Sequence, residues 1–334
     1  MVRLAILFFV LCPMVIRAQD SLLNSIMTRG MVLYDEERYE LALIEYKKAL
    51  EIKPKDGFIN HEVAMAYYQL GNNQEALNYA KKAGKEESES GVQAVMLIGT
   101  IHDNQGNTKK AIKTYKKSIK RFGDYYLLWF NLGVTYNVVG DYENAATAFE
   151  NSIKNRLDHA NSHHALASMK LMQGKRFEVL LPLYFYLLLR PQGELALKAS
   201  TTIDGLWSQG VSIEDDVITL NVGSGRVSQT VLGTEMLLSS IEAEVIQDSL
   251  NDNRLINQSR AAQLFTALAD FDLDNRDDFY TQYYITLFSK IGSSQHMEAF
   301  VNYTSQPLSE EARDWVGTHT MELREFFIWL DELD

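Results

Sequence analysis

The sequence predicts an all-α fold, a solenoid of about five helix-turn-helix repeats followed by a C-terminal helical region. First, small residues recur every 34 or 35 residues, at Gly30, Ala64, Gly99, Gly133 and Ala167. Second, another mostly small position follows each of them twelve residues later, at Ala42, Ala76, Ala111, Ala145 and Val179. Third, a polar turn separates the two positions and contains glycine in four of the five units. A fixed period of this length is typical of repeat proteins, in which each unit packs on its neighbours.

The composition of each unit suits a pair of packed helices. Small residues let two helices approach closely, and glycine ends the first helix without steric cost. Large residues at Tyr46, Tyr115 and Phe149 are expected to fill the space between one repeat and the next. Pro54 and Pro191 close the first and fifth units, because proline stops a helix from continuing.

The stretch from Leu23 to Pro191 resembles five consecutive tetratricopeptide repeats (TPR). The fullest match is the fourth unit, with Trp129-Phe130-Asn131-Leu132-Gly133, Tyr136, Gly140-Asp141-Tyr142, Ala145 and Phe149. The fifth unit departs from the pattern, since Lys170 stands where an aromatic residue is usual. The alternative, a non-repetitive helical bundle, does not explain a 34-residue period.

This resemblance implies a concave wall, built mainly from the first helix of each unit, along which TPR proteins bind peptides. The expected groove residues are Met27, Met31, Tyr34, His61, Met65, Tyr68, Met96, Phe130, Asn131 and His164. Methionine suits an adaptable apolar surface, and Asn131 matches an asparagine with which many TPR proteins hold a ligand backbone. The Lys and Arg set that clamps a C-terminal carboxylate in chaperone-binding TPR proteins is absent. Alternatively, the methionines pack against a C-terminal region that folds back into the groove.

The N-terminus has the three parts of a secretory signal peptide. Arg3 supplies a positive start, residues 4–16 are apolar, and Ala18 precedes the first polar run. We expect cleavage after Ala18 and export to the periplasm, the envelope or the medium; an uncleaved anchor is disfavoured by the short apolar stretch. The only cysteine, Cys12, lies within this segment, so the mature chain is expected to form no disulfide.

The C-terminal third does not continue the repeat. Residues 192–210 are expected to form a helix that caps the last repeat, and residues 211–334 a mainly helical region. The run 217–222 is rich in β-branched residues and reads as extended, without an identifiable partner strand. The aromatic helix at the end is expected to be buried. This tail, with Phe279-Tyr280, Ala299-Phe300 and a closing Phe326-Phe327-x-Trp329-Leu330, is similar to tails of exported TPR proteins of Bacteroidota.

Several chemistries are disfavoured by composition and spacing. A formal net charge of -12 argues against nucleic acid as a partner. Asp270, Asp272 and Asp274 alternate as in a calcium loop, but Asn275 and Thr281 stand where such a loop needs glycine and glutamate. His163 and His164 are adjacent, unlike zinc ligands one helical turn apart. We therefore expect no metal, no small-molecule cofactor and no enzymatic activity.

The sequence predicts an exported, non-enzymatic scaffold or adaptor that binds a protein or peptide in a concave apolar groove. Two alternatives remain. One is a structural envelope protein that homo-oligomerises through its aromatic C-terminal helix, and the other is an enzyme with an unrecognised site in the C-terminal third.

Overall fold

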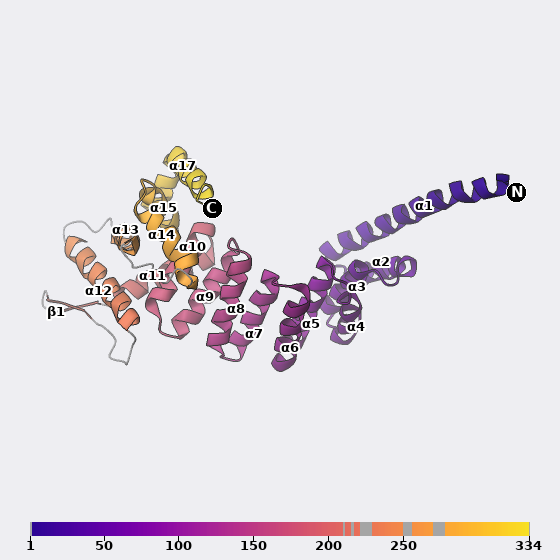
Figure 1. Cartoon of the computed structure of the whole chain (residues 1–334), viewed down its shortest axis with the longest axis horizontal. Coiled ribbons are helices and arrows are strands. Elements are labelled where there is room, and N and C mark those ends of the chain that lie inside the picture. The colour runs from indigo at the N-terminus through magenta and orange to yellow at the C-terminus, as the bar shows by residue number, and fades with distance from the viewer. Residues whose placement is uncertain are drawn as a thin grey trace. The chain divides into compact units, whose positions relative to one another are not determined.

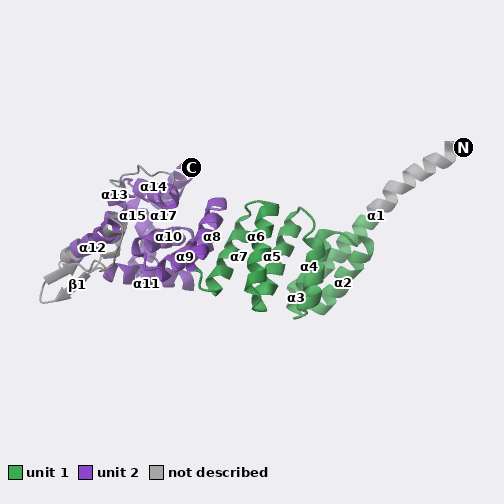
Figure 2. Ribbon diagram, turned by 60° about the horizontal axis from the view of Figure 1, so that its bottom comes forward, with its two compact units in different colours: residues 1–141 green, residues 142–334 purple. Residues whose placement is uncertain are grey.

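The computed structural model describes residues 2–209, 211–214, 217–220, 229–249, 256–269 and 278–333. The chain divides into two compact units, Met1–Asp141 and Tyr142–Asp334 (Figure 2). Within the described residues the structure is helical except for one two-stranded hairpin (Figure 1), so the all-α prediction is confirmed. The boundary between the units falls inside the fourth repeat, between its first and second helices.

Unit 1 consists of helices that pair in sequence order. They are α1 (Val2–Asp35), α2 (Tyr39–Ile52), α3 (Gly57–Gln69), α4 (Asn73–Ala83), α5 (Glu89–Asn104), α6 (Thr108–Phe122) and α7 (Tyr126–Val138). Helix α1 packs on α2, α3 on α4 and α5 on α6, which gives one helix-turn-helix unit per repeat. The first helices α3, α5 and α7 also contact each other in series, so they lie side by side.

The turn inside each repeat has the same hydrogen bonds. The amide of Gly71 donates to the Tyr68 carbonyl and that of Asn72 to the Tyr67 carbonyl, both over 2.9 Å, and the other repeats show the same pattern. This is the Schellman arrangement, which needs a left-handed residue after the helix. Glycine takes that position in four repeats, with φ between 70° and 75°, at Gly71, Gly106, Gly140 and Gly174.

The first repeat places Glu37 at this position, with φ of 59°. A residue with a Cβ is strained there by about 1–2 kcal/mol. Replacing Glu37 with glycine is therefore expected to raise the free energy of unfolding by about 0.5–1 kcal/mol, after the greater freedom of glycine in the unfolded chain is subtracted. Urea denaturation followed by circular dichroism measures this change.

Gly71→Ala is the matched control and should lower stability by about 1 kcal/mol. A Cβ at Gly71 would meet no atom within 4 Å, so its effect comes from the backbone conformation alone. Equal stability of Glu37→Gly and the parent chain would show that the first turn carries no strain.

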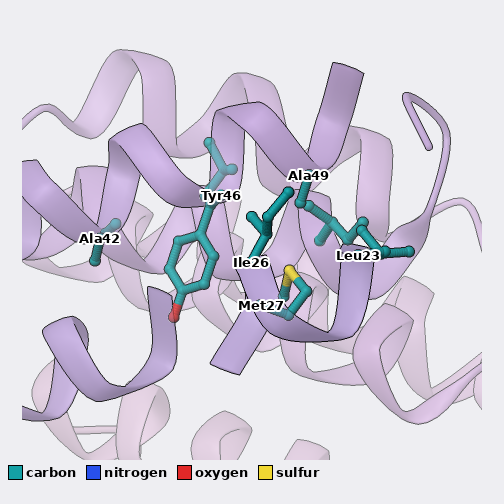
Figure 3. Packing of buried hydrophobic residues seen from close by; sticks show 9 residues of the cluster. Leu23, Ile26, Met27, Ala42, Tyr46 and Ala49 are labelled. Carbon is teal, nitrogen blue, oxygen red and sulfur yellow. The ribbon is translucent and has the colours of Figure 1, made fainter. Parts of the chain in front are cut away.

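Close helix packing depends on the small residues of the repeat. The ring of Tyr46 lies beside Ile26, Met27 and Ala42 (Figure 3), in the core cluster that α1 and α2 share. A Cβ at Gly30 would come within 2.5 Å of this ring. In the third repeat a Cβ at Gly99 would come within 2.3 Å of Tyr115. The expectation that small residues let the two helices of a repeat approach closely is thus confirmed in both repeats.

Unit 2 begins with the second helix of the fourth repeat. Its elements are α8 (Tyr142–Asn155), α9 (Ala160–Met172), α10 (Arg176–Leu189), α11 (Glu194–Ser208), β1 (Val211–Glu214), β2 (Val217–Leu220), α12 (Gln229–Ser249), α13 (Ile256–Ala269), η3 (Thr281–Ile285), α14 (Thr286–Gly292), α15 (Met297–Ser305), α16 (Glu310–Thr318) and α17 (Thr320–Asp331). Helix α10 is central, since 12 of its 14 residues are buried.

Aromatic rings from five helices form the core around α10. The Phe300 ring of α15 lies 5.2 Å from that of Phe265 on α13 and 5.9 Å from that of Phe288 on α14. Tyr184 of α10 and Phe326 of α17 complete the cluster, each 6.3 Å from Phe300. The C-terminal region therefore shares one core with the fifth repeat.

Two expectations about this region need correction. The run 217–222 does find a partner, because β2 pairs antiparallel with β1 in the register Val211↔Leu220. The final helix is not buried as a whole. Only Phe326 of α17 is buried, because a single face of this short helix meets the core.

Candidate functional site

The first helices of unit 1 present one equivalent residue per repeat on a shared surface. This surface, here termed the first-helix wall, is defined by Met31, Met65, Thr100 and Val134. Met31 is 45% and Val134 39% exposed, while Met65 and Thr100 are half-buried. Met31 and Val134 therefore present exposed apolar groups on the first helices of the first and fourth repeats, and Met65 is partly accessible between them in sequence.

Two of the residues expected in the groove lie in the interior instead. Met27 is 8% exposed and belongs to the core of the first repeat, and His61 is 7% exposed. Burial lowers the pKa of His61 to about 4, so the imidazole is neutral at physiological pH. These side chains support the wall from behind and offer almost no surface to a ligand.

Tyr34 and Tyr68 lie half-buried beside the wall and connect consecutive repeats. The amide of Gln69 donates to the Tyr34 hydroxyl over 3.1 Å, and that of Asn104 donates to the Tyr68 hydroxyl over 2.7 Å. The third repeat has an analogous bond from the hydroxyl of Thr135 to the carboxylate of Asp103. This ladder fixes neighbouring first helices against each other. Sequence reasoning identified the two tyrosines but not their partners, which lie 35 and 36 residues away.

Met96, Phe130 and Asn131 are half-buried in α5 and α7. The backbone carbonyl of Asn131 accepts a bond from the Thr135 hydroxyl over 2.9 Å. Its side-chain amide bonds to no residue that the structure describes. An amide in this state can hold a ligand backbone, which is the role that the TPR resemblance implies for Asn131.

In unit 2 the equivalent helix is α9, and its two adjacent histidines have different surroundings. His164 is half-buried against the edge of Tyr186, with ring centroids 5.3 Å apart, and burial lowers its pKa. His163 is fully buried and stacks on Phe185 at 4.3 Å. The Nε2 of His163 donates to the Leu157 carbonyl over 2.7 Å, so its Nδ1 accepts from the Tyr284 hydroxyl over 2.8 Å. His163 is therefore a structural residue, because both its ring nitrogens are hydrogen-bonded within the protein.

Lys170 explains the irregular fifth repeat. Its ammonium pairs with Glu150 at 3.1 Å and Glu178 at 2.9 Å, and it lies 5.3 Å from the ring centre of Tyr280. Burial alone would lower the pKa of Lys170, but the two carboxylates outweigh it and raise the pKa above its usual value. The unusual cation is thus part of the contact between the fifth repeat and the C-terminal region.

A second contact between α10 and the C-terminal region depends on a proline. Pro182 lies inside α10 and has no N–H, so the carbonyl of Glu178 lacks its helical partner. The hydroxyl of Tyr280 donates to this carbonyl over 3.0 Å. The C-terminal region therefore supplies the hydrogen bond that the proline removes.

The buried cations of unit 2, Lys170, Arg176 and Arg260, are ion-paired with carboxylates rather than arranged around a pocket. A cavity of about 320 Å³ opens between α10, α14 and α17, but its lining is mainly apolar, with Lys290 as the single charged group among the lining residues. In the part of the chain that the structure describes, no group of three His, Cys, Asp or Glu could hold a metal ion. Asp270, Asp272 and Asp274 lie outside the described residues.

No helix of the described part of the chain is both long and apolar enough to cross a bilayer. Signal-peptide function of residues 1–18 stays a prediction, and so do the domain boundaries expected from the sequence.

Comparison with known families identifies the repeats. Residues 23–56, 64–126 and 96–162 match models of the tetratricopeptide repeat. The chain therefore contains tetratricopeptide repeats, as its sequence predicts. The likeness of its tail to exported proteins of Bacteroidota stays a prediction.

The chain is also similar to individual proteins. It is 29% identical over 128 residues to the TPR repeat-containing protein MJ1428 of Methanocaldococcus jannaschii, which covers 38% of this chain and 22% of that protein. The chain thus spans about a fifth of the length of this curated relative.

Among solved structures, Pseudomonas aeruginosa PilF shares 15% identity and a TM-score of 0.48, over 57% of this chain and 91% of that one. YrrB, described as a TPR protein with an unusual peptide-binding site, shares 19% identity and a TM-score of 0.40, over 53% and 90%. Likenesses at this level give no basis for transferring a function.

Proposed function

We propose that this protein is a non-enzymatic scaffold that binds a protein or peptide along the first-helix wall of unit 1. The observation that carries the proposal is the register of Met31, Met65, Thr100 and Val134 on the first helices of successive repeats, where Met31 and Val134 are exposed and Met65 is half-buried. An extended or helical peptide contacts such a surface at regular intervals, and methionine adapts to varied side chains.

The wall suits a peptide more than a small molecule. Its residues are spread over the first helices of four repeats, whereas small-molecule sites are concave and enclose most of their ligand. The Tyr34 and Tyr68 ladder holds the helices at fixed spacing before a ligand arrives, which lowers the entropic cost of binding. The side-chain amide of Asn131, which bonds to no residue in the described part of the chain, is positioned to contact the ligand backbone.

Charge introduced on the wall tests the proposal. The double variant Met65→Glu/Val134→Glu is expected to weaken partner binding about tenfold or more, because each buried apolar contact contributes on the order of 1–2 kcal/mol. Partners are recovered from the native organism with the immobilised chain, and calorimetry on the purified partner then compares the variants.

Leu41→Glu/Ile44→Glu is the matched control. These residues of α2 are 41% and 50% exposed, so the substitutions have the same chemistry at similar exposure on a second helix. Full partner affinity of the wall variant would overturn the site assignment, and equal losses in both variants would point to a general charge effect.

We further propose that residues 1–18 direct export and are removed. The mature protein is expected to begin at Gln19, and mass spectrometry of the protein recovered from the cell envelope or the medium measures this directly. Recovery of the intact chain from the cytoplasm would contradict the proposal.

A further inference from the structure

Charge is distributed unevenly along this chain. Unit 1 has 18 Lys and Arg against 16 Asp and Glu, or 16 against 16 without residues 1–18, whereas unit 2 has 14 against 28. The net charge of unit 1 is therefore +2, or 0 after removal of residues 1–18, and that of unit 2 is -14. An asymmetry of this size influences which surfaces attract each other.

Helix α6 is the basic element of unit 1. It contains six lysines and Arg121, and no acidic residue. Ala111, Tyr115 and Ser118 form its buried side, and at 100° per residue all seven cations fall on the opposite side, within about 140°. They span about 18 Å along the helix axis. This set of cations is termed the α6 basic face.

Most of this charge is uncompensated. Arg121 reaches Glu87 only at 3.9 Å, and Lys116 lies over the ring of Tyr136. The other five lysines are exposed. They form no ion pair with any carboxylate that the structure describes. Burial, together with the charges of Lys110 and Lys81, lowers the pKa of His102.

Helices α16 and α17 carry the opposite charge. Their exposed carboxylates outnumber the two arginines, Arg313 and Arg324, three to one: Glu310, Glu311, Asp314, Glu322, Glu325 and Asp331. None of these carboxylates is ion-paired within the described residues, and Arg313 is engaged with the Gln306 carbonyl. These six residues are termed the tail acidic face.

We propose that the α6 basic face of one molecule binds the tail acidic face of a second copy. Both surfaces lie on exposed helices and carry unpaired charges of opposite sign. In a contact between them, the attraction across the interface offsets the repulsion among like charges within each face. The contact is heterologous, because it joins two different surfaces, and it therefore builds a ring or an open chain of molecules. It does not depend on the first-helix wall binding a partner.

The contact is predominantly electrostatic, so salt controls it. The Debye length falls from about 14 Å at 50 mM to about 4 Å at 500 mM salt. Sedimentation velocity of the purified chain should show concentration-dependent association at low salt, with an apparent Kd that rises about tenfold or more at high salt.

Charge-reversal variants test whether these two faces form the contact. The basic-face variant Lys109→Glu/Lys113→Glu/Lys117→Glu/Lys120→Glu and the tail variant Glu310→Lys/Asp314→Lys/Glu322→Lys/Glu325→Lys should each associate at least about tenfold more weakly than the parent chain. An equimolar mixture of the two variants should associate again, because each reversed face then meets an opposite charge. Circular dichroism checks that both variants keep their helices.

The control Lys55→Glu/Lys85→Glu/Lys198→Glu/Lys290→Glu changes the net charge by the same amount at exposed positions outside α6. It should associate within about threefold of the parent chain. The proposal is overturned if the parent chain is monomeric at low salt, if the mixture stays monomeric, or if the control loses association equally. Binding of the monomeric parent chain to phosphatidylglycerol vesicles, lost only in the basic-face variant, would assign the α6 basic face to lipid instead.

Discussion

Replacing Phe300 with alanine is expected to lower the free energy of unfolding of unit 2 by about 3–5 kcal/mol. Phe300 is fully buried, and its ring lies between Phe265, Phe288, Tyr184 and Phe326, which come from four other helices. Removal of the ring leaves a cavity, because the four surrounding helices cannot all move inward to fill it. Urea denaturation gives the overall change, and hydrogen exchange of the α10 amides shows that unit 2 loses the protection.

Phe327→Ala is the control for this substitution. Phe327 is half-buried and lies 5.0 Å from Tyr303 in an edge contact, so its loss should cost less than about 2 kcal/mol. Similar losses for the two phenylalanines would mean that Phe300 is not the centre of this core.

Replacing Arg260 with methionine is expected to destabilise unit 2 by about 3–5 kcal/mol. The guanidinium of Arg260 donates to the carboxylate of Glu242 over 2.6 Å and to that of Asp204 over 2.7 Å. Glu242 is 1% exposed, so the substitution would leave a carboxylate in the interior without its counter-ion. Asp204 faces solvent and would be hydrated instead. Thermal and urea denaturation measure the loss.

The double variant Arg260→Met/Glu242→Leu separates the charge from the packing. Apolar residues of similar size often replace a buried ion pair at little cost, so the double variant should recover most of the lost stability. A double variant as unstable as Arg260→Met alone would show that the geometry of the pair, rather than an unpaired carboxylate, determines stability here.

The sequence was sufficient to predict the repeats because their determinants are local. Gly30 and Tyr46 lie 16 residues apart and contact each other directly, and each turn is closed by bonds that reach back at most five residues. These helix contacts and turns recur at a fixed period, so one sequence contains several examples of the same pattern. The same locality explains why the left-handed position at Glu37 can be found by alignment with Gly71.

The candidate site was less predictable, because helical periodicity identifies a face without saying what covers it. Met27 and Met31 are one turn apart, yet the first is buried by α2 and the second is exposed. Side-chain contacts between residues far apart in the sequence could not be predicted from the sequence. The partners of Lys170 include Tyr280, and that of His163 is Tyr284, 121 residues away. No local signal connects residues so far apart.

The bond from Tyr284 to His163 also sets an order of events during synthesis. Helix α10, with apolar residues on all sides, emerges from the ribosome well before the residues that cover it. At about 5–20 residues per second, the 121 residues between the two partners take on the order of ten seconds to make. The repeats of unit 1 depend on contacts between residues close in sequence and fold within that interval. The apolar surface of the fifth repeat stays exposed until the C-terminal region has been made. A chaperone that binds nascent chains therefore has its longest opportunity at residues 176–189.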